Sequence, residues 1–548
     1  MKITVHIRQA ITIYVAIALV ACGSKEKSPA DPVAQFEMAE KIVATSPGGG
    51  DKATAAEWYQ KAAAGGHAMA GYKLGLMYLA GDGIPKNINE AVYWITTAAD
   101  LDLAEAQLVL ARCYVEGTGV TKDPEQAIKW YRKSAGQGVV EAQFQLGEIY
   151  LLGKDIAKDE NEAVKWMARA AEQDHPAAQN YMGTFHTTGI GGLEKDQRKA
   201  LEWTTKSATN GNASAQFLLG IAYLNGVQDT GGIILEKNPG QAFGWFKKSA
   251  EQGDSMGEYY YGLCHYHGQG VKQDRTEAVK WFRLSAEKGT LLAQMDLGGC
   301  YLAGCGIPKD HGEAVKWFRK VAEKGNPMAQ YLLGNTLVGG DDAILDFNEG
   351  AMWLKKAADQ GVVFAQYELA SYHYHTKGGT GNPAECIAWT RKASDQGYAP
   401  AQQLLASFYL AGYGDIRKDE VKAVELLQKA AGNGNVAAQM MLASCQMKGI
   451  GTPVDEAGAV GWYRKAAEQG NVDAMALMAE RYYTGKGVPQ DIRKARELYE
   501  KAGLRQVYDE LEKMCVDIES ELGVEIRAKG GTIQGAAVAL KRAMSVQP

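Results

Sequence analysis

Proline is scarce in this chain: only 14 of the 548 residues are proline, against 64 glycines. A collagen-like triple helix needs glycine at every third position together with abundant proline, and the sequence has neither feature. Lysine and arginine form no stripe with interleaved aromatic residues, and the formal net charge is -5. We therefore expect no nucleic-acid partner.

Motifs that carry chemistry are also few, and each has a simpler structural explanation. Ser285 and Lys288 match the S-x-x-K motif of penicillin-recognising enzymes, but no S-D-N or K-T-G motif follows. His265 and His267 are two residues apart, and on a helix such side chains point in different directions, so they cannot chelate one metal ion. We expect no catalytic residues, no metal site and no cofactor.

The N-terminus has the pattern of an export signal. Lys2 and Arg8 precede a largely apolar stretch, Ala10–Ala21, which is too short to span a bilayer and is typical of a secretory signal peptide. The segment from Leu19 to Cys22 resembles the bacterial lipobox, which implies cleavage after residue 21 and lipid attachment to Cys22. The alternative is an ordinary signal peptide with a cysteine nearby by chance. Gly23 favours an outer-membrane location facing the periplasm.

Internal repetition is what the chain has in abundance. Aligned on the small residue before Gln107, it contains 13 copies spaced by 36 residues, except for 37 at two steps and 42 at one. We call this small residue the anchor; it is Ala in all copies but one, which has Gly257. Such a period predicts helical hairpins that stack as a solenoid. The anchors are residues 34, 70, 106, 142, 178, 215, 257, 293, 329, 365, 401, 438 and 474.

The other columns of the repeat predict how each hairpin is built. All 11 tryptophans share one column, and Asp or Asn stands seven residues before it in all 13 copies, where it caps a second helix. Glycine eight residues after the tryptophan column ends that helix in ten copies. Gly or Ala five residues after each anchor lets the two helices approach closely, and the tryptophan is expected to fill the larger gap.

The cysteines do not fall into regular pairs. Cys113, Cys264, Cys300 and Cys445 occupy one column, and equivalent positions on packed helices lie about 8–10 Å apart. A disulfide needs Cα atoms within about 7 Å of each other. We therefore expect buried free thiols at these positions and at Cys386.

The repeat unit A-x-A-Q-x-x-L-G-x-x-Y-x-x-G-x-G-V-x-x-D-x-x-x-A-x-x-W-x-x-x-A-A-x-x-G resembles the SEL-one-like repeat, a relative of the tetratricopeptide repeat. The resemblance implies an all-α, right-handed α-solenoid of about 13 helix-turn-helix repeats of 36 residues. We expect a lipoprotein signal peptide in 1–21, a tether in 22–32, the solenoid in 33–503, and a C-terminal capping helix and tail in 504–548. Extra residues around Gln228–Leu235 predict a loop in copy 6 that reaches toward a partner.

The resemblance also implies where a partner binds. In tetratricopeptide-like solenoids the first helix of each repeat lines the concave groove. In this chain the matching columns are rich in aromatic residues or vary between copies. The residues predicted to line the groove are Tyr259, Tyr331, Tyr367, His267, Asn335 and His375.

The expected function is that of a membrane-anchored interaction scaffold or adaptor of the bacterial cell envelope, which binds a protein or peptide through this groove. One alternative is a protein that binds peptidoglycan or exopolysaccharide, because stacked tyrosines suit sugars as well as peptides. The other alternative is a β-lactam-recognising hydrolase, since some relatives have been linked with β-lactam binding. The missing S-D-N and K-T-G motifs count against this last reading.

Overall fold

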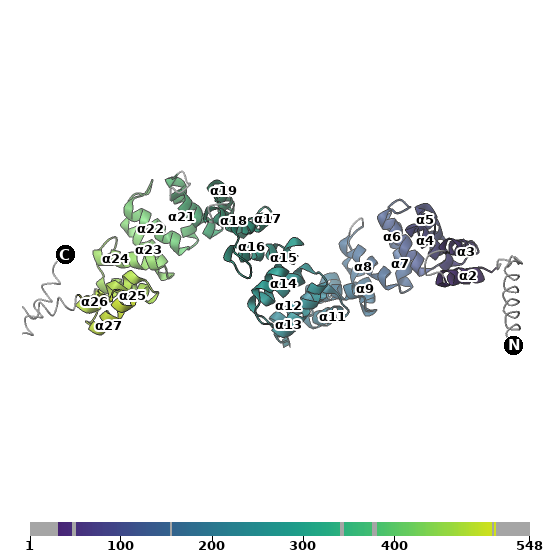
Figure 1. The fold of residues 1–548 in the computed structure, drawn as a ribbon, viewed down its shortest axis with the longest axis horizontal. Coiled ribbons are helices and arrows are strands. Elements are labelled where there is room, and N and C mark those ends of the chain that lie inside the picture. The colour runs from purple at the N-terminus through teal and green to yellow at the C-terminus, as the bar shows by residue number, and fades with distance from the viewer. Residues whose placement is uncertain are drawn as a thin grey trace, which may run out of the picture. The chain divides into compact units, whose positions relative to one another are not determined.

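The computed structural model describes residues 31–45, 51–153, 156–339, 345–374, 381–506 and 509–510. These residues form 26 α-helices and one two-stranded sheet, and most helices are 13 residues long (Figure 1). The predicted all-α solenoid of about 13 paired-helix repeats is confirmed. The chain consists of two compact units, and the boundary between them lies between Ser285 and Ala286.

In each copy an even-numbered helix comes first and an odd-numbered helix second. The first unit contains α2 (Pro32–Thr45), α3 (Lys52–Ala64), α4 (Ala68–Ala80), α5 (Ile88–Asp100), α6 (Ala104–Glu116), α7 (Pro124–Gly136), α8 (Val140–Leu152), α9 (Glu160–Glu172), α10 (Pro176–Thr188), the 3-10 turn η1 (Ile190–Gly192), α11 (Gln197–Thr209), α12 (Ala213–Asn225), β1 (Val227–Asp229), β2 (Gly232–Leu235), α13 (Pro239–Glu251), α14 (Ser255–His267) and most of α15 (Arg275–Glu287).

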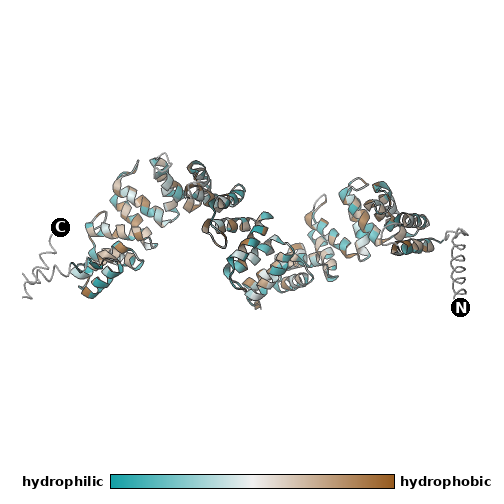
Figure 2. Cartoon of the chain, in the orientation of Figure 1, coloured by the Kyte–Doolittle hydropathy of each residue, from teal (hydrophilic) through white to brown (hydrophobic). Residues whose placement is uncertain are grey.

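The second unit begins near the end of α15. It contains α16 (Leu291–Ala303), α17 (His311–Ala322), α18 (Pro327–Gly339), α19 (Phe347–Asp359), α20 (Val363–Tyr374), α21 (Pro383–Asp395), α22 (Ala399–Ala411), α23 (Glu420–Gly432), α24 (Val436–Lys448), α25 (Glu456–Glu468), α26 (Val472–Thr484) and α27 (Ile492–Lys501). Hydrophobic and hydrophilic residues alternate within single helices (Figure 2), as expected for helices that bury one face and expose the other.

Twelve of the 13 capping residues act as predicted, whereas the Asp51 side chain makes no capping hydrogen bond at the start of α3. From Asn87 to Asp491, the Asp or Asn side chain before the second helix accepts a hydrogen bond from a backbone N–H at the start of that helix. Where the closing glycine is replaced by Asp102, the backbone still has a positive φ of 65°. The Asp102 carboxylate accepts a hydrogen bond of 2.8 Å from the Gln107 amide, which helps hold a conformation that glycine adopts freely.

The close approach of the two helices depends on the residue that follows the tryptophan. A Cβ atom added to Gly298 would lie 2.6 Å from the ring of Phe318, and one added to Gly262 would lie 2.8 Å from Phe282. Phe318 and Phe282 directly follow the tryptophans of their copies, and both are completely buried. The prediction that the tryptophan fills this gap was therefore wrong, because the neighbouring residue is the one that points at the first helix.

The tryptophans instead pack toward the preceding copy and are covered by charged side chains. Trp94 joins the hydrophobic cluster of copy 1, which includes Tyr59. Trp389 donates its indole N–H to Glu385 at 3.0 Å, while the Lys392 ammonium lies 3.8 Å from the ring centroid. A cation over the ring and an acceptor at the indole nitrogen let a large aromatic side chain lie at the edge of the core.

A buried glutamine directly after the anchor joins successive copies. The Gln366 amide donates to the carbonyl oxygen of Ala358 at 3.1 Å, near the end of the preceding second helix. Its own oxygen accepts a hydrogen bond of 2.8 Å from Gln396 of the next second helix. The same two bonds occur in other copies, for example around Gln143. Each such glutamine therefore bonds helices from two copies.

The extra residues of copy 6 form an ordered structure. Strands β1 and β2 pair as an antiparallel hairpin, and Asp229 at the end of β1 forms an ion pair of 2.9 Å with Arg198 of α11. The predicted loop is thus a hairpin held against the preceding copy. The predicted signal peptide, 1–21, most of the predicted tether, 22–32, and most of the predicted capping helix and tail, 504–548, lie outside the described residues.

Packing at the helix contact can be tested with two adjacent glycines of α16. We expect Gly298→Val to lower the free energy of unfolding by about 2–3 kcal/mol, because the added methyl groups overlap the buried Phe318 ring. Gly299→Ala is the matched control: a Cβ there meets no atom within 4 Å, and the helix gains up to about 1 kcal/mol in propensity. Urea-induced unfolding measures both, and equal effects would contradict the proposed packing.

The glutamine bonds predict a graded loss of stability. Gln366→Leu should lower the free energy of unfolding by about 2 kcal/mol, because it removes two hydrogen bonds, one to the Ala358 carbonyl and one from the Gln396 amide, each contributing about 1 kcal/mol. Gln294→Leu should cost about 1 kcal/mol, because the Gln294 side chain keeps only the bond to Ala286 and its oxygen has no partner among the described residues. Urea unfolding of both variants compares them, and a larger loss for Gln294→Leu would refute this account.

Candidate partner-binding face

The residues predicted to line the groove belong to both units. In the first unit, Tyr259 is only 7% exposed and packs against Phe282, with ring centroids 5.7 Å apart, so little of its ring is open to a ligand. His267 is exposed at the end of α14. In the second unit, Tyr331, Asn335 and Tyr367 are half-buried on α18 and α20. His375 lies outside the described residues.

The second unit brings two of the predicted tyrosines into one aromatic cluster. The Tyr331 and Phe364 ring centroids are 5.9 Å apart, Phe364 and Tyr398 are 5.5 Å apart, and Tyr398 and Tyr367 are 5.4 Å apart. The last two contacts are edge-to-face, the arrangement that aromatic pairs favour. We call these four residues the aromatic patch. They come from three successive copies, on α18, on α20 and just before α22.

The local fold explains why these rings meet. Tyr398 is the residue that precedes α22, with an extended backbone, so its side chain reaches back toward the middle of α20. The same geometry stacks His67 on Phe36 at 4.3 Å and His175 on Phe144 at 4.4 Å. The residue before a first helix therefore contacts the residue two after the preceding anchor. Sequence analysis missed this column, although aromatic residues recur in it.

The patch is only partly covered by protein. Phe364 is 43% exposed, and Tyr331, Tyr367 and Tyr398 are half-buried, although Tyr331 also packs against the core around Leu354. Large apolar side chains that share one exposed surface are typical of binding sites. Tyrosine and phenylalanine offer a large contact area with few rotatable bonds, so ordering them on binding costs little entropy.

The acidic residue Glu368 lies on α20, directly after Tyr367 and one helical turn after Phe364. Burial raises the pKa of the Glu368 carboxyl above its ordinary value. Burial and the negative charge of Glu368 both raise the pKa of the Tyr331, Tyr367 and Tyr398 hydroxyls. One carboxylate is therefore the common electrostatic neighbour of three rings of the patch.

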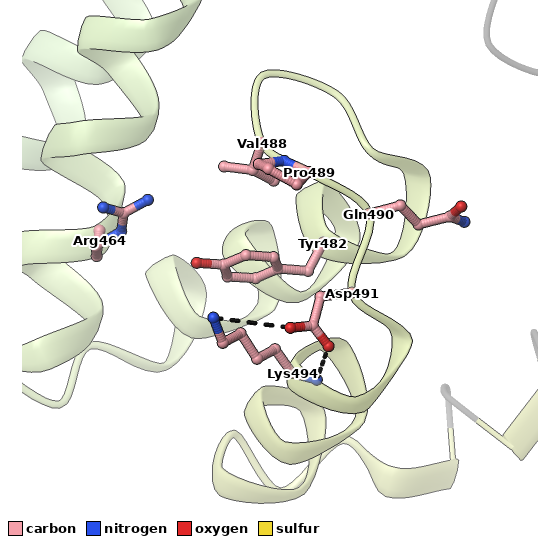
Figure 3. A pocket seen from close by; sticks show the side chains of 7 residues that line it. All are labelled: Arg464, Tyr482, Val488, Pro489, Gln490, Asp491 and Lys494. Carbon is pink, nitrogen blue, oxygen red and sulfur yellow. Dashed lines mark hydrogen bonds and ion pairs between the residues drawn. The ribbon is translucent and has the colours of Figure 1, made fainter.

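A cavity lies in the last two copies, away from the aromatic patch. Arg464, Tyr482, Val488, Pro489, Gln490, Asp491 and Lys494 line a cavity of about 490 Å³. Figure 3 shows the Tyr482 side chain between Arg464 of α25 and Lys494 of α27. Lys494 is 3.7 Å from the Asp491 carboxylate, which also caps α27. The positive charge that an anion would need is thus partly neutralised within the cavity.

The motif residues with a possible chemical role have structural roles in this fold. Ser285 is completely buried, and its hydroxyl donates to the Ser255 carbonyl at 2.6 Å. Ser134, Ser207 and Ser249 make the same bond in other copies, so Ser285 belongs to the repeat architecture. His265 packs edge-to-face against Tyr261, with centroids 4.9 Å apart.

The cysteines are as expected: Cys113, Cys264, Cys300, Cys386 and Cys445 are buried free thiols, and Cys305 is a half-buried one. Within the part of the chain that the structure describes, no three His, Cys, Asp or Glu side chains converge as a metal site. No helix in that part is long and apolar enough to cross a membrane.

Comparisons with known proteins agree with this architecture. A family model described as the Sel1 repeat matches 13 consecutive segments from residue 32 to residue 506. The crystal structure of a protective antigen present in uropathogenic Escherichia coli strains, described as displaying an SLR fold, is 32% identical, with a TM-score of 0.69 over 83% of this chain and 94% of that chain.

A Sel1 repeat protein from Oxalobacter formigenes is 31% identical and covers 63% of this chain and 95% of its own, with a TM-score of 0.44. No curated protein matches the sequence.

Proposed function

Because the chain belongs to the Sel1 repeat family, we propose that it is an interaction scaffold of the bacterial cell envelope that binds a protein partner through the aromatic patch. Sel1 repeat proteins bind protein partners and typically act as interaction scaffolds. The observation that carries the choice of surface is the continuous contact from Tyr331 through Phe364 and Tyr398 to Tyr367.

The repeat architecture supports binding by this face. The first helices α18, α20 and α22 are each bonded to the preceding second helix by a buried glutamine, Gln330, Gln366 or Gln402, so the patch is built on rigid elements. A pre-ordered surface loses less conformational entropy on binding than a mobile one. Tyr331 and Tyr367 belong to a column that is aromatic in several copies, whereas Phe364 and Tyr398 stand in columns that vary between copies.

The location in the envelope is a proposal based on the N-terminal sequence. The basic start, the apolar stretch and the lipobox-like segment ending at Cys22 support a lipid-anchored protein of the outer membrane that faces the periplasm. Acyl chains on Cys22 and on the new N-terminus together would give stable anchoring, whereas a single chain would bind only weakly.

The patch is tested by crosslinking and affinity capture from envelope extracts. We expect the native protein to retain one protein partner, and a Tyr331→Ala, Phe364→Ala, Tyr398→Ala variant to lose it, because truncating clustered aromatic residues typically costs at least about 2 kcal/mol each. Tyr93→Ala is the control, since Tyr93 is 61% exposed and lies outside the patch.

Two other outcomes would change the proposed binding face or the proposed class of partner. If the native and the patch variants retain the same proteins, binding by this face is refuted. If the native protein instead retains purified sacculi after proteins have been stripped from them, the partner is a cell-wall glycan. Exposed tyrosine rings stack on sugars as readily as on peptides, so this outcome has a physical basis.

The anchor is tested separately. We expect Cys22→Ala to shift the protein from the membrane fraction to the soluble fraction and to abolish labelling by a radioactive fatty acid, because no other residue would carry the lipid. Cys305→Ala should change neither result, since Cys305 is a half-buried thiol within the solenoid. Retention of label in Cys22→Ala would contradict lipid attachment at this residue.

A further inference from the structure

Glu368 differs from Glu40 and Glu141, two other acidic residues on the first helices. Glu40 forms an ion pair of 2.5 Å with Lys73 and accepts a hydrogen bond from Tyr59, and Glu141 pairs with Arg112 at 2.9 Å. Glu368 has neither a hydrogen bond nor an ion pair among the described residues, although it is half-buried.

Comparison of the copies explains why Glu368 lacks a partner. Lys73 bonds Glu40, and the Tyr181 hydroxyl lies 3.3 Å from the Glu148 carboxylate; both pairs join residues 33 apart on successive first helices. The residue 33 before Glu368 is Asn335, which carries no charge. Glu368 therefore occupies the position of Lys73 and Tyr181, and the preceding copy supplies no cation opposite its carboxylate.

An unpaired carboxylate in a half-buried site is unfavourable on its own. Removal from water disfavours the charged form, and an opposite charge nearby offsets that loss. The faces of aromatic rings also attract cations, more strongly when water is excluded. Glu368 and the aromatic patch thus favour the same kind of ligand, a cation with apolar surface around it.

We infer that the aromatic patch and Glu368 together bind a lysine or arginine side chain of an extended protein segment. The aliphatic stem lies on the Tyr331 and Phe364 rings, and the charged group reaches the Glu368 carboxylate. The inference rests on the proposed function, because it identifies the ligand class of the same face.

The extent of the patch indicates a segment and not an isolated cation. The patch draws residues from α18, α20 and the residue before α22, and the contacts from Tyr331 through Phe364 to Tyr398 span at most about 11 Å between ring centroids. An extended peptide covers that distance with about three residues. One basic residue would reach Glu368 while its neighbours contact the outer rings.

Peptide display tests the inference with the full-length protein. Random peptides of about ten residues, long enough to span the patch, are selected against the native protein, Glu368→Gln and Glu425→Gln. Glu425 is an exposed residue of α23, so its substitution removes the same charge from outside the patch. We expect enrichment of lysine or arginine with the native and Glu425→Gln proteins, and no such enrichment with Glu368→Gln.

Binding of one selected synthetic peptide then gives the magnitude. We expect Glu368→Gln to weaken it about tenfold, as loss of a partly desolvated charge partner implies. Replacing the basic residue of the peptide by norleucine or citrulline should weaken binding to the native protein by a similar factor. This arm changes no residue of the protein, so it stays informative even if a variant folds poorly.

The outcomes separate this inference from the proposed function. Peptides that depend on Tyr331, Phe364 and Tyr398 but show no basic preference would refute the cation site and leave the binding face in place. Peptides that bind the triple alanine variant as well as the native protein would refute both. Equal binding of the basic peptide to native protein and Glu368→Gln would also overturn the inference.

Discussion

The buried glutamine that follows most anchors is the interaction on which the stacking of copies depends. The last carbonyl groups of a helix have no partner within that helix, so they can accept hydrogen bonds from other elements. The Ala358 carbonyl accepts one from the Gly361 N–H and another from Gln366, and Gln366 in turn accepts a bond from Gln396, directly after the next second helix. This bonding aligns neighbouring copies and so places their first helices side by side.

Because the copies are aligned, residues that differ between them lie on one surface, which we propose as the binding surface. Columns with a structural role, such as the small residue at 298 and the cap at Asp310, contact residues within the repeat framework. The remaining positions on the first helices are free to differ. In the second unit they bring together Tyr331, Phe364 and an acidic residue whose neighbouring copy supplies no cation.

Much of the hairpin was predictable because its determinants are local. The cap at Asp123 and the left-handed turn at Gly117 each depend on residues within a few positions of one another, so their spacing identifies them. The buried state of Ser285 and of the cysteines also followed from their place in the repeat. The residue of the second helix that packs against the small residues could not be predicted. Neighbouring positions on that helix are equivalent in sequence until the packing angle between the two helices is known.

The candidate site shows the same division. The sequence by itself determined the repeat length, the helix boundaries and the aromatic column that contains Tyr331 and Tyr367, since each is a regular feature of the chain. Only the tertiary structure decided that Tyr259 is buried, that Tyr398 reaches back to Tyr367, and that Glu368 has no hydrogen bond or ion pair with any described residue. These properties arise between copies, where exposure and charge balance depend on which side chain the neighbouring helix presents.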